Sequence, residues 1–283
     1  MMRITRFFSL LFLFSNTVAA GALHPLCLDR FTDPEKSSSA GTSTSTMTSL
    51  DLRACQKQYA HLNFDQKSPW LASFNATRTN TETSQEESET LPVFAAYHII
   101  GQMENEQVLV NYAVSYGGSG TFSFGFLFKG LSLDTFPNLD DALAGKKRSA
   151  NLELIKNFSG GDRCFGGITD MRIEAPDKVS VTRNMTPYKL VSLGVPDNQR
   201  TKRYGDLPDC ARCCIGEFTE IIDLNGQSEL LEVRLTGTRL EQGTDRSEQQ
   251  ACLAGLIGAG NKNLILNRKQ LEDLQASYRT DCF

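Results

Sequence analysis

The chain has few of the residues on which recognised catalytic motifs depend. Only three histidines occur, His24, His61 and His98, and the sequence holds no G-x-S-x-G, H-E-x-x-H or Walker pattern. His98 lies in an apolar segment and is the one plausible general base, although a histidine in such a segment more often serves a structural hydrogen bond. These absences weigh against most recognised classes of enzyme.

A dense basic stripe is also missing. The chain has 29 Lys and Arg against 33 Asp and Glu, a net charge of −4. Its basic clusters, 146–148 and 200–203, are short and are typical of solvated loops. Because nucleic-acid binding relies on neutralising many phosphates, we expect no nucleic-acid partner.

The only long apolar run lies at the N-terminus. Arg3 and Arg6 precede the apolar segment 7–14, and the small residues of 18–20 follow, which is the order of a cleavable signal peptide over residues 1–20. The run is shorter than the roughly 20 residues that a membrane-spanning helix needs. Cleavage after residue 20 removes two arginines and no acidic residues, so 27 basic residues remain against 33 acidic ones, a net charge of −6. We therefore expect a secreted or periplasmic protein without a transmembrane segment.

Eight cysteines remain after this cleavage. An even number of cysteines in an exported chain predicts disulfides, each worth about 2–4 kcal/mol, but 105 pairings are possible. A lipid anchor on the first cysteine is the alternative, which the preceding Pro25 and Leu26 disfavour because small residues are expected there. The disulfide candidates are Cys27, Cys55, Cys164, Cys210, Cys213, Cys214, Cys252 and Cys282.

The cluster Cys210-Ala211-Arg212-Cys213-Cys214 has two further interpretations. A C-x-x-C pair with a neighbouring arginine can be a redox centre, but the following residues 217–224 predict a strand, not the helix that such centres use. A structural zinc site needs four ligands, and no second C-x-x-C occurs. Structural disulfides are favoured, with Cys164 in its glycine-flanked loop 160–167 as a partner for Cys210, Cys213 or Cys214; Asp162 and Arg163 beside it predict a loop salt bridge or a ligand contact.

Two segments have too little apolar surface to fold alone. Lys36 to Ser49 and Asn75 to Thr90 consist mainly of small and polar residues, which predicts a largely disordered region over 21–90. Between them, Ser49 can cap a short helix near 50–62 that presents Leu52, Cys55, Tyr59 and Leu62 on one face. The main domain is expected over 91–283.

Segments of this domain have the β-branched and aromatic composition of strands. Asn225-Gly226 is the strongest hairpin signal. The expected strands are 93–100, 107–116, 120–129, 152–158, 168–174, 178–183, 216–224 and 228–237.

The strand 120–129 carries four phenylalanines on one face. Phe122, Phe124, Phe126 and Phe128 alternate with other residues, and we expect them to form the core beneath a sheet; an exposed aromatic platform for a ligand is the alternative. The glycine-rich 117–120 predicts a hairpin turn, because a phosphate-binding loop would need a following helix and lysine.

Helical signals follow the strands. Thr186-Pro187 predicts a short helix to Leu193, and two capping signals, Ser247 with Gln250 and Asn267 with Gln270, predict two C-terminal helices. The fold class is therefore α+β, mainly an antiparallel meander or sandwich-like sheet with two C-terminal helices.

The sequence favours a non-catalytic exported binding or envelope-associated module without a cofactor, metal ion or assigned catalytic residue. Its ligand is expected to be a protein or a small molecule. The alternatives are a hydrolase that uses carboxylates such as Asp140-Asp141 or His98, and a thiol-disulfide oxidoreductase that uses Cys210 and Cys213. Sequons at Asn75, Asn157 and Asn184 occur at about the frequency expected by chance.

Overall fold

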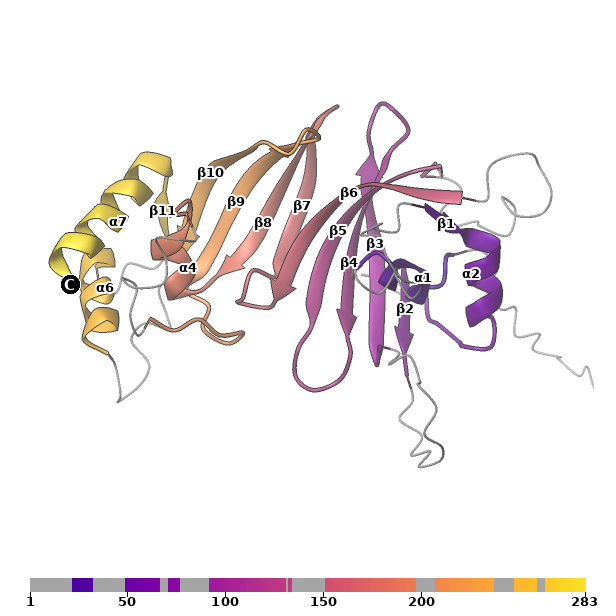
Figure 1. Ribbon diagram of the computed structural model, residues 1–283, viewed down its shortest axis with the longest axis horizontal. Helices are drawn as coiled ribbons and strands as arrows, with labels where there is room; N and C mark the ends of the chain where they lie inside the picture. Colours follow the sequence, from indigo (N-terminus) through magenta and orange to yellow (C-terminus); the bar gives the residue numbers. More distant parts are fainter. Residues whose placement is uncertain are drawn as a thin grey trace, which may run out of the picture.

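A computed structural model describes residues 22–32, 49–66, 71–76, 92–130, 132–133, 151–196, 207–236, 247–258 and 263–283. This part of the chain contains two antiparallel sheets, 11 strands and five short helices (Figure 1). The expectation of a mainly antiparallel β protein with two C-terminal helices is confirmed. No helix in the described ranges is long and apolar enough to span a membrane.

The first sheet contains six strands in the order β1-β6-β5-β4-β3-β2. The four central strands form a meander from β3 to β6, and the two short strands pair at its edges. The strands are β1 (Ser49–Asp51), β2 (Ala72–Asn75), β3 (Phe94–Gln102), β4 (Val108–Ser115), β5 (Phe122–Lys129) and β6 (Asn151–Asp162).

The second sheet contains five strands in the order β11-β10-β9-β8-β7. Consecutive strands pair along most of their length. The strands are β7 (Ile168–Ala175), β8 (Lys178–Met185), β9 (Gly216–Asp223), β10 (Ser228–Leu235) and β11 (Leu264–Leu266). At the β9–β10 turn, the Gly226 N–H donates to Asp223 O at 3.1 Å and Gly226 has φ 95°, which confirms the Asn225-Gly226 hairpin.

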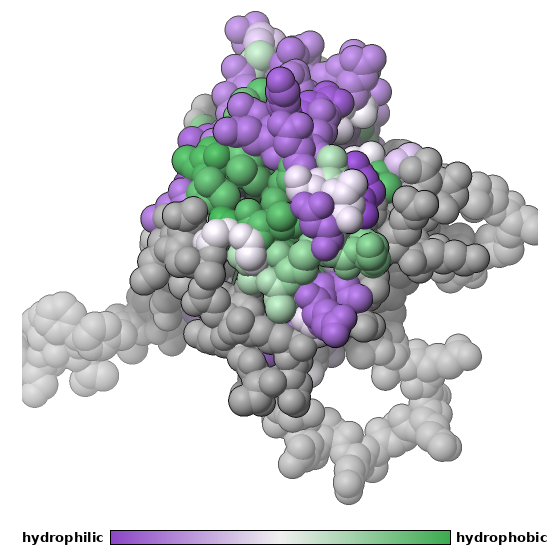
Figure 2. All heavy atoms as spheres, turned by 90° about the vertical axis from the view of Figure 1, so that its left-hand side faces the viewer, coloured by the Kyte–Doolittle hydropathy of each residue, from purple (hydrophilic) through white to green (hydrophobic). Residues whose placement is uncertain are grey.

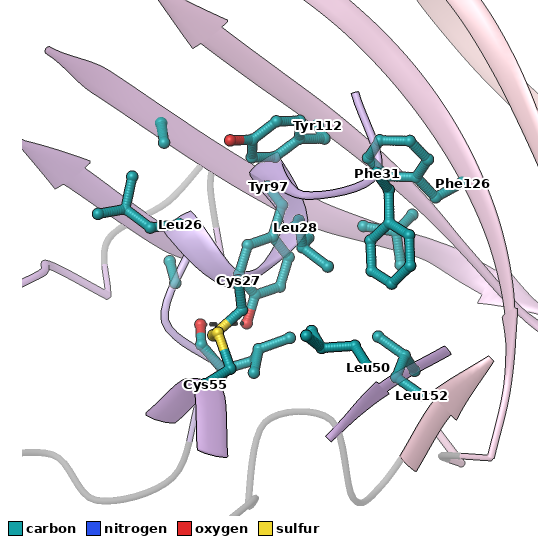
Figure 3. Packing of buried hydrophobic residues seen from close by; sticks show 14 of the residues in the cluster. Leu26, Cys27, Leu28, Phe31, Leu50, Cys55, Tyr97, Tyr112, Phe126 and Leu152 are labelled. Atoms are coloured by element: carbon teal, nitrogen blue, oxygen red, sulfur yellow. Dashed lines mark hydrogen bonds between the residues drawn. A yellow bond between two sulfur atoms is a disulfide. The ribbon is translucent and has the colours of Figure 1, made fainter. Parts of the chain in front are cut away.

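One face of the first sheet is covered by N-terminal segments. Helices α1 (Leu26–Asp29) and α2 (Leu52–Tyr59) are joined by a disulfide between Cys27 and Cys55, and Tyr97 of β3 donates its hydroxyl hydrogen bond to Leu23 O at 2.9 Å (Figure 3). We call the resulting core the N-terminal cluster. Its buried members include Leu23, Leu26, Leu28, Phe31, Leu50, Leu52, Tyr97, Val110, Tyr112, Phe126, Phe128 and Leu152.

The opposite face of the first sheet packs against β7 and β8. Leu109 and Leu127 of the first sheet meet Met171 and Val181 of the second in a core that we call the inter-sheet cluster. The contact is close, because a Cβ on Gly125 would lie 2.3 Å from Met171 Cε. Both faces of β5 are therefore buried over much of its length.

Helices α4 (Pro187–Ser192), α6 (Glu248–Ile257) and α7 (Arg268–Asp281) cover the far end of the second sheet (Figure 1). Their core, the C-terminal cluster, includes Met185, Leu190, Phe218, Val233, Leu235, Leu253, Leu266, Leu271 and Tyr278. Val181 and Met185 are four residues apart on β8 and so share a face of the sheet, yet they belong to different clusters. One face of the second sheet is therefore divided between the first sheet and the helices, which leaves the other face open.

The expected strands occur within a few residues of their expected ends, except that β6 extends to Asp162. The capping boundaries of the last two helices are also confirmed, since Ser247 accepts from Gln250 N and Asn267 from Gln270 N.

The N-cap expected at Ser49 is wrong. Ser49 belongs to β1, and Asp51 caps α2 by accepting from Arg53 N and Ala54 N, because its carboxylate reaches two unpaired N–H groups of the first turn. The helix itself and its buried face are confirmed, with Leu52, Cys55 and Tyr59 buried.

Asn75 was expected in a disordered segment, but it ends β2 and pairs with Phe94. Residues 77–91 and 33–48, most of the two low-complexity segments, lie outside the described residues, as does the expected signal peptide. The division of the chain at residue 91 stays a prediction, although the N-terminal cluster contains residues from both sides of it.

The row of phenylalanines is buried in part. Phe126 and Phe128 are buried in the N-terminal cluster, Phe124 packs at its edge, and Phe122 is 40% exposed. The core interpretation is confirmed for three of the four rings. Phe122 is the first residue of β5, at the end of the strand, where it stays exposed.

Candidate functional site

The open face of the second sheet contains a polar hollow of about 340 Å³. Its floor comes from β7, β8, β9 and β10. We call this site the sheet hollow, and it is lined by Thr169, Asp170, Arg172, Glu174, Ser180, Thr182, Glu217, Thr219, Leu231, Glu232 and Arg234.

A row of polar residues crosses the floor of the sheet hollow. Asp170, Thr182, Thr219 and Glu232 lie directly opposite one another on successive strands. The hydroxyl oxygens of Thr182 and Thr219 are 3.0 Å apart and share a hydrogen bond. Because neighbouring strands are about 4.8 Å apart, the two carboxylate-bearing residues at the ends of the row are separated by roughly 14 Å. Each end can therefore contact a different part of one ligand.

Most charged groups of the hollow already have a partner. Arg172 contacts Asp170 at 2.8 Å and Arg234 contacts Glu232 at 3.0 Å. Such exposed ion pairs contribute little to stability and rearrange readily when a ligand offers a better partner. The lining has four carboxylates and two guanidinium groups, so it has an excess of negative charge.

Glu217 is the exception among these charged groups. It lies on β9, the central strand of the sheet, between Asn184 of β8 and Arg234 of β10. Among the described residues, no hydrogen bond or ion pair engages its carboxylate. A half-buried carboxylate on a rigid strand is thus available to accept hydrogen bonds from a ligand.

His98 lies near one end of the hollow. It is half-buried on β3 of the first sheet, and burial lowers its pKa, while the charge of Asp170 on β7 opposes that shift. The structure thus brings the one plausible general base of the main domain within electrostatic reach of a carboxylate that lines the hollow. The sequence did not indicate this pairing, since the two residues are 72 positions apart and belong to different sheets.

The eight cysteines form four disulfides, which confirms the expected oxidised state. Cys27 pairs with Cys55, Cys164 with Cys214, Cys210 with Cys213, and Cys252 with Cys282. The expected bridge from Cys164 to the 210–214 cluster is present, and it ties the loop between the two sheets to the segment that enters β9. In that loop, Arg163 Nε donates to Asp162 Oδ1 at 2.9 Å, as expected for a loop salt bridge.

The remaining residues that the sequence singled out lie elsewhere or outside the described ranges. Asp140 and Asp141 lie outside the described residues. His24 is buried in the N-terminal cluster between Tyr59, Phe64 and Phe74. In the described ranges, no three His, Cys, Asp or Glu side chains are grouped as a metal ion would require.

Figure 2 faces the helical end of the molecule and shows a patch of apolar side chains below a hydrophilic region. Helix α6 carries apolar residues on most of its surface: Leu253 and Ile257 are buried, whereas Ala251 is exposed and Leu256 half-exposed. Phe283 nearby is 57% exposed. The exposed surface of this end is therefore apolar in part and hydrophilic in part.

Searches for relatives found no matching protein family, no matching curated protein and no matching solved structure. The fold and the site thus define the class: a disulfide-stabilised protein of two antiparallel sheets with a polar hollow on one open sheet face.

Proposed function

We propose that the protein is an exported, non-catalytic binding module, secreted or periplasmic, and that the sheet hollow holds its ligand. The four disulfides support an oxidising compartment, where such bonds persist. The floor of the hollow supports binding, because side chains that project from paired strands are positioned more rigidly than side chains on loops.

The observation that carries the proposal is the carboxylate of Glu217, which no hydrogen bond or ion pair within the described residues engages, beside the paired charges of Arg172 and Arg234. A ligand with an ammonium or guanidinium group gains a charge-assisted hydrogen bond there and can reach Thr182, Thr219 and Glu232 on the same floor. We therefore propose a cationic, hydrogen-bonding ligand, such as a lysine-containing segment of a partner protein.

A titration with a short oligolysine peptide tests this proposal. In NMR spectra of the oxidised protein, we expect shifts of backbone amides in β7–β10 and none in β3–β6. An oligoglutamate peptide of the same length is the matched ligand control. The variant Glu217→Gln keeps the shape of the side chain and should weaken binding roughly tenfold, the equivalent of losing one charge-assisted hydrogen bond.

The matched control variant is Glu153→Gln, which removes one negative charge from an exposed position on β6. It should bind oligolysine like the unaltered protein. Equal weakening by both substitutions would show that oligolysine responds only to net charge, and the proposal for this hollow would then be wrong.

A hydrolase is the second candidate, favoured by the electrostatic influence of Asp170 on His98. A histidine near a carboxylate can act as a general base. Chromogenic ester, glycoside and peptide substrates provide the test: turnover that is lost in His98→Gln, with an unchanged fold by circular dichroism, would support this alternative over simple binding.

A further inference from the structure

The four disulfides differ in what they connect. Three of them join segments that are far apart in the chain and close long loops, with sequence separations of 28, 50 and 30 residues. The fourth, Cys210–Cys213, has a separation of only 3 residues. A bridge over so short a loop restricts the unfolded chain far less than the others do, so stability alone does not account for it.

The turn that contains Cys210 and Cys213 is held in place by other contacts. On its N-terminal side, Thr186 Oγ1 donates to Asp209 Oδ1 at 2.8 Å. Within the turn, the Cys213 N–H donates to Cys210 O at 3.0 Å. These contacts are independent of the sulfur–sulfur bond.

The C-terminal side of the turn is fixed as well. Cys214 is bound to Cys164, and the Cys164 N–H donates to Ala211 O at 3.3 Å. Because both sides are anchored, the two sulfur atoms are expected to stay close together after reduction, which favours rapid reclosure of the bond.

The Cys210–Cys213 bridge is also accessible. Cys210 is exposed, whereas Cys27, Cys55 and Cys164 are at most 5% exposed. The exposed Arg212 lies between the two cysteines in the sequence of the turn, so no bulky apolar side chain separates them.

We propose that Cys210–Cys213 is a thiol–disulfide exchange site of the folded protein. An external thiolate attacks Cys210 Sγ and forms a mixed disulfide, while the Cys210–Cys213 bond breaks and its electron pair leaves on Cys213 Sγ. A second external thiolate then attacks the external sulfur of the mixed disulfide. The products are the Cys210 and Cys213 thiols, protonated from solvent, and one oxidised external disulfide. In reverse, the dithiol reduces an external disulfide.

Graded reduction of the folded mature protein tests this inference. The protein is treated with reduced glutathione or with reduced thioredoxin, trapped with iodoacetamide, and mapped by peptide mass spectrometry. We expect the first two alkylated residues to be Cys210 and Cys213, while the half-buried Cys252–Cys282 bridge in the same molecule remains closed. The far-ultraviolet circular dichroism spectrum should not change at this stage.

The two reductants distinguish the source of the thiol. Reduction by glutathione supports exchange with small thiols, and reduction by thioredoxin alone supports exchange with a protein dithiol. Resistance to both reductants, or opening of Cys252–Cys282 at the same concentration, would overturn the proposal.

Variants that lack one cysteine of the pair test which of the two sulfur atoms reacts first with the partner. In Cys213→Ser, the exposed Cys210 remains and should form a mixed disulfide with oxidised glutathione roughly tenfold faster than Cys213 does in Cys210→Ser, because attack requires access to the sulfur. Equal rates in the two folded variants would contradict Cys210 as the sulfur that meets the partner.

Discussion

Arg183 Nη1 donates to Glu220 Oε2 at 2.9 Å, in an ion pair that joins β8 to β9. The side chains are only 13% and 22% exposed. The pair lies on the covered face of the second sheet, beside Val181 of the inter-sheet cluster and Phe218 of the C-terminal cluster. It thus occupies the junction at which this face passes from one apolar core to the other.

Breaking this pair from one side should destabilise the protein. Burial already lowers the pKa of Arg183, and the charge of Glu220 opposes that shift, so Glu220→Gln leaves a poorly solvated cation. We expect a loss of about 2–3 kcal/mol in the free energy of unfolding, measured by urea denaturation. The double variant Arg183→Met/Glu220→Leu should lose less stability than the sum of the losses in the single variants Arg183→Met and Glu220→Leu; additive losses would show that the two groups are not coupled.

The stability of the protein should fall as the pH drops from 6.5 towards 4 because of His24. Burial lowers the pKa of His24 to about 4 from its ordinary 6.5. The folded state therefore holds the neutral ring while the unfolded state takes up a proton, which costs about 3 kcal/mol by pH 4 and nothing above pH 7.

The variant His24→Phe should lose most of this additional pH dependence, because it keeps a ring against Tyr59, Phe64 and Phe74 but cannot be protonated. Its stability at pH 7 is expected to be lower, since Leu26 N–H loses the Nδ1 acceptor. The control is His61→Gln at an exposed position, which should keep most of the slope because burial is the largest cause of the shift. An unchanged slope in His24→Phe would contradict the assignment.

Two glycine-to-alanine substitutions should change the stability of the protein in opposite directions. A Cβ on Gly216 would lie 2.2 Å from the backbone oxygen of Arg234 on β10, so Gly216→Ala should force the strands apart and cost about 1–3 kcal/mol. Gly255 lies in α6, and a Cβ there would meet none of the described residues within 4 Å apart from the helix's own backbone, so Gly255→Ala should stabilise the helix by about 0.5–1 kcal/mol. Thermal denaturation of both variants measures the difference, and a shift of the same sign in both would be the contrary result.

The phenylalanine row of β5 should respond unequally to truncation. Phe126 is fully buried between Phe31, Tyr112 and Phe128, so Phe126→Ala should cost about 3–5 kcal/mol. Phe122 is 40% exposed, and Phe122→Ala should cost less than about 1 kcal/mol. Chemical denaturation compares the two directly; similar losses would mean that Phe122 is covered in solution.

Much of the secondary structure could be predicted because its signals are local. The alternation in 120–129, the Asn225-Gly226 turn and the capping box at Asn267 act over two to four residues, and each corresponds to an element in the structure. The prediction that Ser49 caps α2 was wrong for a local reason too. Asp51 competes for the same unpaired N–H groups and lies closer to the helix.

The candidate site could not be predicted in this way. Asp170, Thr182, Thr219 and Glu232 are ordinary polar residues in their own strands, and only the pairing register brings them into one row. Likewise, the approach of Asp170 to His98 depends on the packing of one sheet on the other.

The sequence by itself determined the eight strands β3 to β10, the turns and the two C-terminal helices, because backbone propensity and side-chain alternation are properties of neighbouring residues; the short strands β1, β2 and β11 were not expected from it. Only the tertiary structure decided that one face of the second sheet is shared by two cores while the other stays open, and which cysteines pair. Those outcomes depend on contacts between residues far apart in the chain, and a local sequence pattern does not indicate the energies of such contacts.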